Sequence, residues 1–188
     1  MEYFAYLNKV HQKYHNEYKQ NKDKKPTIYK ELLPKGVNVI DQLTDIDSMV
    51  LETDENIIIT NRGLDLRSIR DLVILKDMIT NQKNQDNKYN LILEMERNKI
   101  KKIQNQYNKP IILTGYSRGG KKVYDLGNEL NLEYHAFNPA DTTTLIDNIV
   151  GEKKEITNQL QPSPQGNIYK TANDIVSIGY NGTIVKNN

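Results

Sequence analysis

The most constraining feature of the chain is the hexapeptide Gly-Tyr-Ser-Arg-Gly-Gly at residues 115–120, which lies between two regular segments. An apolar run at residues 111–114 precedes it and predicts a strand, whereas residues 121–130 are predicted to form a helix. Gly115 and Gly119 lie two residues either side of Ser117. In such a tight turn the serine adopts a strained backbone conformation, and side chains at both flanking positions would collide. The sequence therefore predicts a strand–turn–helix unit that holds the serine hydroxyl clear of a sheet.

A serine in this position has a specific chemical use. A nucleophile elbow requires a strand, a sharp turn with a central serine, and a helix, in that order. The N-terminus of the helix carries partial positive charge and free N–H groups, which would stabilise a developing oxyanion. The string G-x-S-x-G has little specificity alone, but its context between a predicted strand and a predicted helix makes Ser117 a candidate nucleophile.

Apolar runs and helical periodicity divide the rest of the chain into alternating elements. Helices are predicted at residues 2–20, 27–33, 65–79, 89–107, 121–130 and 142–150. Strands are predicted at residues 48–52, 56–60, 111–114, 132–137 and 167–171, with a terminal hairpin of 175–178 and 183–185. This alternation predicts a single α/β domain with a largely parallel central sheet flanked by helices. We expect an N-terminal helical segment, residues 1–34, to pack on a core of residues 35–188.

Composition narrows the classes of function. The 188 residues carry a formal net charge of +2, so no nucleic-acid footprint is evident. The absence of cysteine excludes disulfides, thiolate zinc sites and a cysteine nucleophile. No signal peptide or membrane span is visible, so we expect a soluble intracellular protein. Abundant Lys, Asn, Ile and Tyr are typical of an AT-rich genome, which suits a large DNA virus or phage and a cytoplasmic or virion-associated protein.

Three segments, in chain order, together resemble the class 3 (fungal-type) lipase branch of the α/β-hydrolase superfamily. Residues 57–64, Ile-Ile-Ile-Thr-Asn-Arg-Gly-Leu, are similar to the family's strand that ends in a Phe-Arg-Gly-Ser/Thr turn and precedes an Asp-rich helix. Residues 115–120 are similar to its nucleophile elbow. Residues 168–176, Ile-Tyr-Lys-Thr-Ala-Asn-Asp-Ile-Val, are similar to the strand that delivers its triad acid. The resemblance covers roughly residues 45–180 and implies an α/β-hydrolase-like fold.

The resemblance implies roles for individual residues. Ser117 matches the nucleophile and Asp174 the triad acid, although an Asn-Asp pair after a strand is also ordinary turn chemistry. The backbone N–H groups of Arg118 and Leu64 match the two oxyanion donors, and replacing the family's Ser/Thr by Leu64 preserves the backbone donor. The implied reaction is hydrolysis of a small ester or lipid through an acyl-enzyme, with neither a cofactor nor a metal.

The general base is the main departure from the family, in which a histidine follows the acid. A serine hydroxyl needs an adjacent base with a pKa near 7, but no histidine follows Asp174. His135 lies on a predicted strand and is either a core histidine or the missing base. His11 and His15 share one side of the first helix, where we expect a solvated face. The alternatives are a metal-binding pair, or a first helix that brings His15 to Ser117.

Two other functions fit the same residues. Tyr116 and Arg118 replace the family's usual His and Leu beside the serine, and a guanidinium is unusual next to an acyl chain. The first alternative is therefore a catalytically degenerate α/β-hydrolase that acts as a structural or binding protein with a protein partner. The second is a nucleotide site, because residues 115–122 nearly fit the phosphate loop G-x-x-x-x-G-K-[ST]. In that motif Lys122 replaces the hydroxyl that would bind Mg²⁺.

Overall fold

A seven-stranded sheet, with strands in the order β1 to β7, forms the centre of the computed structural model. The structure describes residues 1–20, 26–65, 68–80, 88–140, 159–172, 177 and 179–185. The strands are β1 (Asn38–Val39), β2 (Ser48–Glu52), β3 (Ile57–Asn61), β4 (Ile111–Tyr116), β5 (Glu133–Phe137), β6 (Gly166–Thr171) and β7 (Thr183–Val185). The first three strands pair antiparallel, and β3 through β7 pair in parallel. The predicted single α/β domain with a largely parallel sheet is confirmed.

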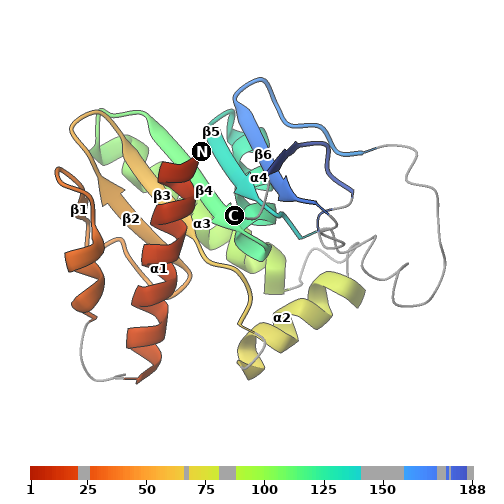
Figure 1. The fold of residues 1–188 in the computed structure, drawn as a ribbon, viewed down its shortest axis with the longest axis horizontal. Coiled ribbons are helices and arrows are strands. Elements are labelled where there is room, and N and C mark those ends of the chain that lie inside the picture. The colour runs from red at the N-terminus through yellow and green to blue at the C-terminus, as the bar shows by residue number, and fades with distance from the viewer. Residues whose placement is uncertain are drawn as a thin grey trace.

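Helices cover both faces of this sheet (Figure 1). They are α1 (Glu2–Gln20), the 3₁₀ helix η1 (Ile28–Leu32), α2 (Ile69–Thr80), α3 (Lys88–Gln106) and α4 (Arg118–Leu130). Successive strand residues point to opposite faces, so each strand contributes to two cores. Met49, Leu51 and Ile58 pack with α1 and η1, whereas Val50 and Ile59 pack with α3 and α4. Both faces are thus buried, as parallel strands require.

Most predicted elements lie within a few residues of their expected positions. The larger shifts are at helix starts, because α2 begins at Ile69 rather than residue 65 and α4 at Arg118 rather than residue 121. The predicted helix at 142–150 lies outside the described residues. The two-residue strand β1 was not predicted.

The C-terminal hairpin is not formed as predicted. Thr183 aligns with Tyr169, so β7 pairs in parallel with β6 instead of forming one arm of a hairpin. The other predicted arm, residues 175–178, lies almost entirely outside the described residues. The carboxyl ends of five parallel strands therefore lie along one edge of the sheet.

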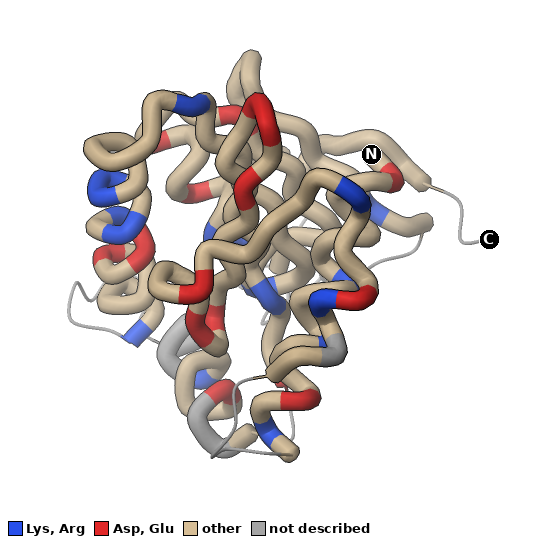
Figure 2. Tube along the Cα trace, turned by 90° about the vertical axis from the view of Figure 1, so that its left-hand side faces the viewer, with Lys and Arg blue, Asp and Glu red and all other residues tan. Residues whose placement is uncertain are grey.

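Charged residues of both signs are interspersed along the chain in the view of Figure 2. This mixture agrees with the small net charge of +2. Among the described helices, none combines the length and the apolar character needed to cross a bilayer.

Candidate active site

Ser117 occupies a strained turn between β4 and α4. Its backbone angles are φ 54° and ψ −118°, a region that residues with a side chain rarely adopt. The Ser117 N–H donates to the carbonyl oxygen of Phe137 at 2.9 Å, and its carbonyl oxygen accepts from the N–H of Ala140 at 3.1 Å. The Lys121 N–H also donates to the Ser117 carbonyl oxygen, at 2.9 Å. Hydrogen bonds to β5, to the segment after it and to α4 thus fix the turn, and the Ser117 side chain remains half-buried.

The glycines around Ser117 permit close contacts between backbones. A Cβ added at Gly115 would lie 2.3 Å from the carbonyl oxygen of Gly119. One added at Gly119 would lie 2.1 Å from the carbonyl oxygen of Asn61, although real Cβ contacts essentially never fall below 3.0 Å. The start of α4 therefore packs directly on the ends of β3 and β4, and this packing excludes side chains at both positions.

The Arg62-Gly63-Leu64 segment after β3 lies beside this turn. A Cβ added at Gly63 would lie 3.4 Å from the Ser117 Cβ and 3.2 Å from the carbonyl oxygen of Tyr116. Among the described residues, neither the N–H of Leu64 nor that of Arg118 has a hydrogen-bond acceptor. The two predicted oxyanion donors thus belong to adjacent segments and retain free N–H groups.

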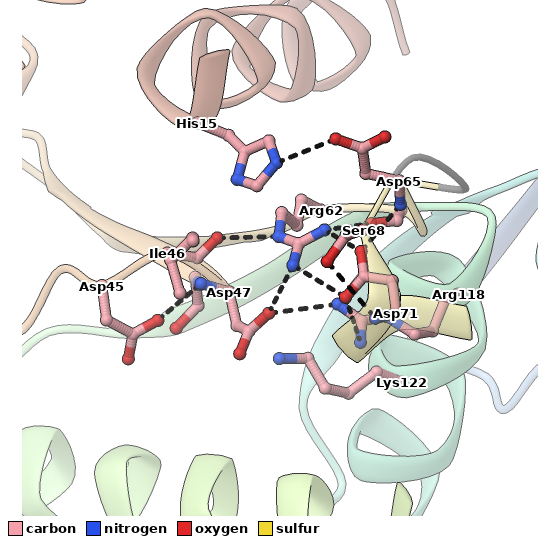
Figure 3. Close-up of polar contacts among 12 residues, drawn as sticks. His15, Asp45, Ile46, Asp47, Arg62, Asp65, Ser68, Asp71, Arg118 and Lys122 are labelled. Carbon is pink, nitrogen blue, oxygen red and sulfur yellow. Dashed lines mark hydrogen bonds and ion pairs between the residues drawn. The ribbon is translucent and has the colours of Figure 1, made fainter. Parts of the chain in front are cut away.

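A buried ion cluster connects the two segments (Figure 3). The Arg62 guanidinium donates from Nη1 to Asp71 Oδ2 at 2.6 Å and from Nη2 to Asp71 Oδ1 at 3.1 Å. Arg62 Nη2 and Arg118 Nη2 each lie 3.1 Å from Asp47 Oδ1. Asp71 Oδ2 also accepts the N–H of Asp65 at 2.7 Å. Through two carboxylates, the segment after β3 is tied to the first residue of α4.

The charge state of Asp71 follows from these contacts. Burial alone would raise the pKa of this carboxyl, because its side chain is fully buried. Hydrogen bonds from Arg62 and from the Asp65 N–H, and the charges of Arg118 and Arg62, outweigh burial and hold the pKa below its usual value. Asp71 is therefore ionised at neutral pH and binds the two arginines as a carboxylate.

Arg118 does not place its charge beside an acyl chain. Its side chain is 3% exposed, and its guanidinium contacts Asp47 and, at 3.8 Å, Asp71. The unusual arginine beside Ser117 is thus part of the ion cluster. An arginine at this position requires buried carboxylates nearby, since an unpaired buried charge is costly. Asp47 was not predicted as a site residue, because the sequence shows neither that Arg118 is buried nor which acidic residue pairs with it.

His135 is a core histidine in the described structure. Its Nδ1 lies 3.2 Å from the Tyr169 hydroxyl oxygen, and its Nε2 lies 3.0 Å from Glu133 Oε1. The imidazole stacks on the ring of Phe4 from α1, with 3.9 Å between ring centroids. Burial lowers the pKa of His135, and the hydrogen bond to Glu133 only partly opposes this shift. His135 thus contributes to the contact between α1 and the sheet.

His11 and His15 do not lie on a solvated face of the first helix, so this prediction was wrong. Their exposures are 0% and 2%, because both point from α1 toward the molecule's interior. His15 Nε2 lies 3.5 Å from Asp65 Oδ2, whereas neither ring nitrogen of His11 has a partner among the described residues. Burial, followed by the nearby charge of Arg62, lowers the pKa of His11 to about 3.

No imidazole of this chain hydrogen-bonds to Ser117. All three histidines belong to the described residues, where His15 and His135 contact other groups and His11 is buried without a partner. The predicted acid, Asp174, lies outside the described residues. Within the described part of the chain, no group of three His, Asp or Glu side chains is placed to hold a metal ion.

A cavity of about 1000 Å³ adjoins the Ser117 turn. Its walls include Gly63, Tyr116 and Phe137, each of which contacts or precedes Ser117. Ser117 itself is beside the cavity rather than in its walls. Residues of α1 and β7 form much of the remaining wall, so a molecule in the cavity would lie between α1 and the carboxyl ends of the strands.

Solved structures of lipases share this architecture. The structure is similar to lipase II from Rhizopus niveus over 94% of this chain and 73% of that one, with a TM-score of 0.50 and 14% identity. A fungal lipase in complex with an inhibitor matches over 93% of this chain and 72% of its own, with a TM-score of 0.46 and 13% identity. No protein-family model and no curated protein sequence matches the chain. This chain has a lipase-like α/β-hydrolase fold.

The lipase-like fold confirms the architecture expected from the resemblance, and the geometry argues against the phosphate loop. Lys121, which would bind phosphate in that motif, pairs instead with Asp125 at 2.9 Å, one turn further along α4. Lys122 is buried and pairs with Glu96 of α3 at 3.1 Å. Both ammonium groups are thus occupied on the sides of the helix rather than at its N-terminus.

Proposed function

We propose that this chain acts on carboxylic esters, which acylate the Ser117 hydroxyl. The observation that carries the proposal is the strained backbone of Ser117 beside the N–H groups of Leu64 and Arg118, neither of which has an acceptor among the described residues. Strain at a serine persists only where surrounding structure enforces it, and such positions cluster at functional sites. Paired backbone donors next to a hydroxyl are suited to a tetrahedral acyl-transfer intermediate.

The proposed reaction has two steps. The Ser117 oxygen attacks the ester carbonyl carbon, and the resulting oxyanion accepts hydrogen bonds from the N–H groups of Arg118 and Leu64. Collapse of this intermediate breaks the bond to the alcohol, which leaves with a proton, and water then hydrolyses the acyl-serine. We propose Asp174 as the acid of this set and His135 as its base. To act as the base, His135 would first have to leave Glu133 and Tyr169.

The contacts of the imidazoles predict slow turnover. Removing the triad typically costs roughly a millionfold in kcat, with residual rate from the oxyanion donors and binding. If hydroxide takes the serine proton in place of an imidazole, the acylation rate rises steadily with pH. We therefore expect activated esters and phosphonates to react far faster than ordinary esters.

The second candidate is a catalytically degenerate α/β-hydrolase that serves as a structural or binding protein. The observation that favours it is that His15 and His135 contact other groups and His11 is fully buried. In this case the strained turn is retained without chemical use, and the partner is a protein, including a partner in a virion.

A fluorophosphonate probe tests the proposal directly. We expect it to label the wild-type chain between pH 7 and 9, and Ser117→Ala to lose all labelling. Ser163→Ala serves as the matched control, because Ser163 is another partly buried serine outside the Ser117 turn. Absence of labelling in the wild type, or equal labelling of the two variants, would support the degenerate protein instead.

Histidine variants then test whether an imidazole acts as the base for Ser117. If no imidazole serves Ser117, replacing His11, His15 or His135 by Gln leaves the labelling rate of the folded protein within about twofold of wild type. A loss of tenfold or more in His135→Gln alone would identify His135 as the base. Circular dichroism of each variant establishes that the labelled protein is folded.

A further inference from the structure

All three histidines of the chain lie in one contact, between α1 and the rest of the molecule. His11 and His15 belong to α1 and are buried, and His135 of β5 is buried against the Phe4 ring of α1. Histidine is the side chain whose ordinary pKa lies between pH 5 and 8. Protonation of the histidines therefore adds positive charge at this contact and not elsewhere.

His11 occupies a position on α1 that suits an apolar side chain. Leu7, Val10 and Tyr14 of the same helix are buried against the sheet beside it. Both ring nitrogens of His11 are buried without a hydrogen-bond partner among the described residues. A leucine would fill this position without burying unpaired polar atoms. The packing of α1 therefore does not require an imidazole here.

The charged groups that act on His11 come from three other segments and from α1 itself. Burial, followed by the charges of Arg62 and Lys122, lowers the pKa of His11 to about 3. His15, one turn further along α1, also lowers this pKa, and the Asp45 carboxylate opposes the shift only in part. A proton on His11 is therefore costly while α1 is docked, and the cost disappears once the imidazole reaches water.

His15 lies beside a carboxylate that already has a lysine partner. Its Nε2 is 3.5 Å from Asp65 Oδ2, and the same oxygen accepts a hydrogen bond from Lys19 Nζ at 2.6 Å. Figure 3 shows the imidazole pointing from α1 toward Asp65. Burial, followed by the charge of Arg62, lowers the pKa of His15; Asp65 opposes this shift, and the Lys19 charge adds to it. Docking of α1 therefore disfavours a proton on His15 as well.

His135 is the third titratable group of this contact and lies near the start of α1. Its polar neighbours are the Glu133 carboxylate, the Tyr169 hydroxyl and the amino group of Met1. Burial lowers the pKa of His135, the Glu133 carboxylate opposes this shift, and the Met1 amino group adds to it. A proton on His135 would therefore also weaken the contact with α1.

We propose that acid releases α1 from the sheet while the strands stay paired. At neutral pH the apolar side of α1 holds the helix in place, and protonation of the three histidines in water opposes this docking. The helix precedes the first strand and is not part of the sheet, so it can separate without breaking any strand pairing. Because α1 forms part of the wall of the cavity beside the Ser117 turn, its release would also open that cavity. The inference does not depend on whether Ser117 is a nucleophile.

The pKa of His11 sets the expected size of the effect. It is ordinarily 6.5 and falls to about 3 when α1 is docked. From this residue alone, the released helix is therefore favoured about 25-fold more at pH 5 than at pH 7. His15 and His135, whose pKa values docking also lowers, add to this factor.

Hydrogen exchange of the intact protein at pH 7 and pH 5, corrected for the intrinsic exchange rate at each pH, tests the release. We expect the protection of α1 amides to fall about 25-fold or more between the two pH values. At pH 5 the most protected α1 amides should exchange roughly tenfold faster than those of β4, or more. Equal protection of α1 and β4 at pH 5 would mean that α1 separates only when the whole chain unfolds. That result, or unchanged protection of α1, would overturn the inference.

Variants of α1 test whether the histidines cause the release. In His11→Leu the fall in α1 protection between pH 7 and pH 5 should shrink by roughly tenfold or more, since leucine does not titrate. His15→Leu, in which Asp65 keeps its pair with Lys19, should also show a smaller fall than wild type. Lys13→Leu, at an exposed position of the same helix, is the matched control and should keep the wild-type fall. A wild-type fall in both histidine variants, or an equal reduction in Lys13→Leu, contradicts the inference.

Discussion

The Ser117 turn has the geometry that a nucleophile elbow requires. The three histidines, in contrast, do not lie where they would supply the base that such an elbow needs. At the turn, backbone strain and two close glycine contacts fix Ser117 beside the N–H groups of Leu64 and Arg118, for which the described residues offer no acceptor. The imidazoles are buried in the contact between α1 and the sheet. Backbone packing and the buried ion cluster hold the turn, whereas proton transfer would need a single imidazole next to Ser117. The N–H groups that we propose as oxyanion donors and the three histidines therefore depend on different parts of the lipase-like fold.

One of the largest expected losses of stability comes from a substitution that disrupts the turn itself. In Gly119→Ala the added Cβ would overlap the Asn61 carbonyl oxygen, and neither backbone can move freely. We expect unfolding free energy, measured in urea, to fall by about 3 kcal/mol or more, on the scale of severe overpacking.

The matched control for this variant is Gly36→Ala. Gly36 has a φ of 83°, but a Cβ added there would have no atom within 4 Å. The substitution should therefore cost only about 1 kcal/mol, the penalty for a side chain in a left-handed conformation. Equal losses in the two variants would show that the contact with the Asn61 carbonyl oxygen adds little to the cost at Gly119.

The ion cluster offers a comparison of two equally buried pairs. Asp71→Asn breaks the contacts to Arg62 and Arg118, and Glu96→Gln breaks the pair with Lys122. Each should lower the unfolding free energy by roughly 3 to 5 kcal/mol, because a buried partner charge remains. Asp71→Asn should also slow phosphonate labelling at least tenfold by loosening the Leu64 and Arg118 N–H groups, while Glu96→Gln should leave labelling unchanged in folded protein. Equal labelling rates would assign Asp71 a purely structural role.

The burial of His11 predicts that the free energy of unfolding depends on pH. The pKa of His11 is about 3 in the folded chain against an ordinary value of 6.5, so the unfolded chain binds more protons below pH 6.5. The stabilisation is complete above that pH and is lost as the pH falls toward 3. Linkage gives a loss of about 2 kcal/mol between pH 7 and pH 5 from this residue.

Urea titrations at both pH values measure this loss. His11→Leu should flatten the dependence by about 2 kcal/mol, since the leucine neither titrates nor leaves an unpaired polar atom in the core. Exposed Lys13→Leu on the same helix is the control and should keep the wild-type slope. An unchanged slope in His11→Leu would assign the pH dependence to His15 or His135, whose pKa values burial also lowers.

The elements were predictable because their signals are local. Apolar runs defined the central strands, and the glycine spacing around Ser117 defined the turn. The burial of His11 was also present in the pattern, because it follows Leu7 by four residues and precedes Tyr14 by three. The interior position of Arg118 depends on Asp47, 71 positions away, which no local rule detects. The parallel pairing of β7 was missed because the connection from Thr171 to Thr183 is short for a parallel crossover.

The smallest expected effect measures the strain at Ser117. A side chain at φ 54° and ψ −118° costs about 1 to 3 kcal/mol, which glycine avoids. Glycine gives back about 0.5 to 1 kcal/mol through greater freedom in the unfolded chain. Ser117→Gly should therefore exceed Ser117→Ala in unfolding free energy by about 1 kcal/mol, or roughly 2 to 4 °C in Tm by calorimetry.

Both variants remove the hydroxyl, so the difference between their unfolding free energies reports the backbone strain at residue 117. If Ser117→Gly is the more stable, the chain keeps a serine at a cost that the fold does not require, which favours selection for the hydroxyl and hence the esterase. If Ser117→Ala is as stable as Ser117→Gly or more stable, the backbone at residue 117 is not strained. The conformation of the turn then gives no support to a catalytic serine over a degenerate one. The same pair of variants thus tests whether the turn is maintained for catalysis, although the histidines are buried in the core.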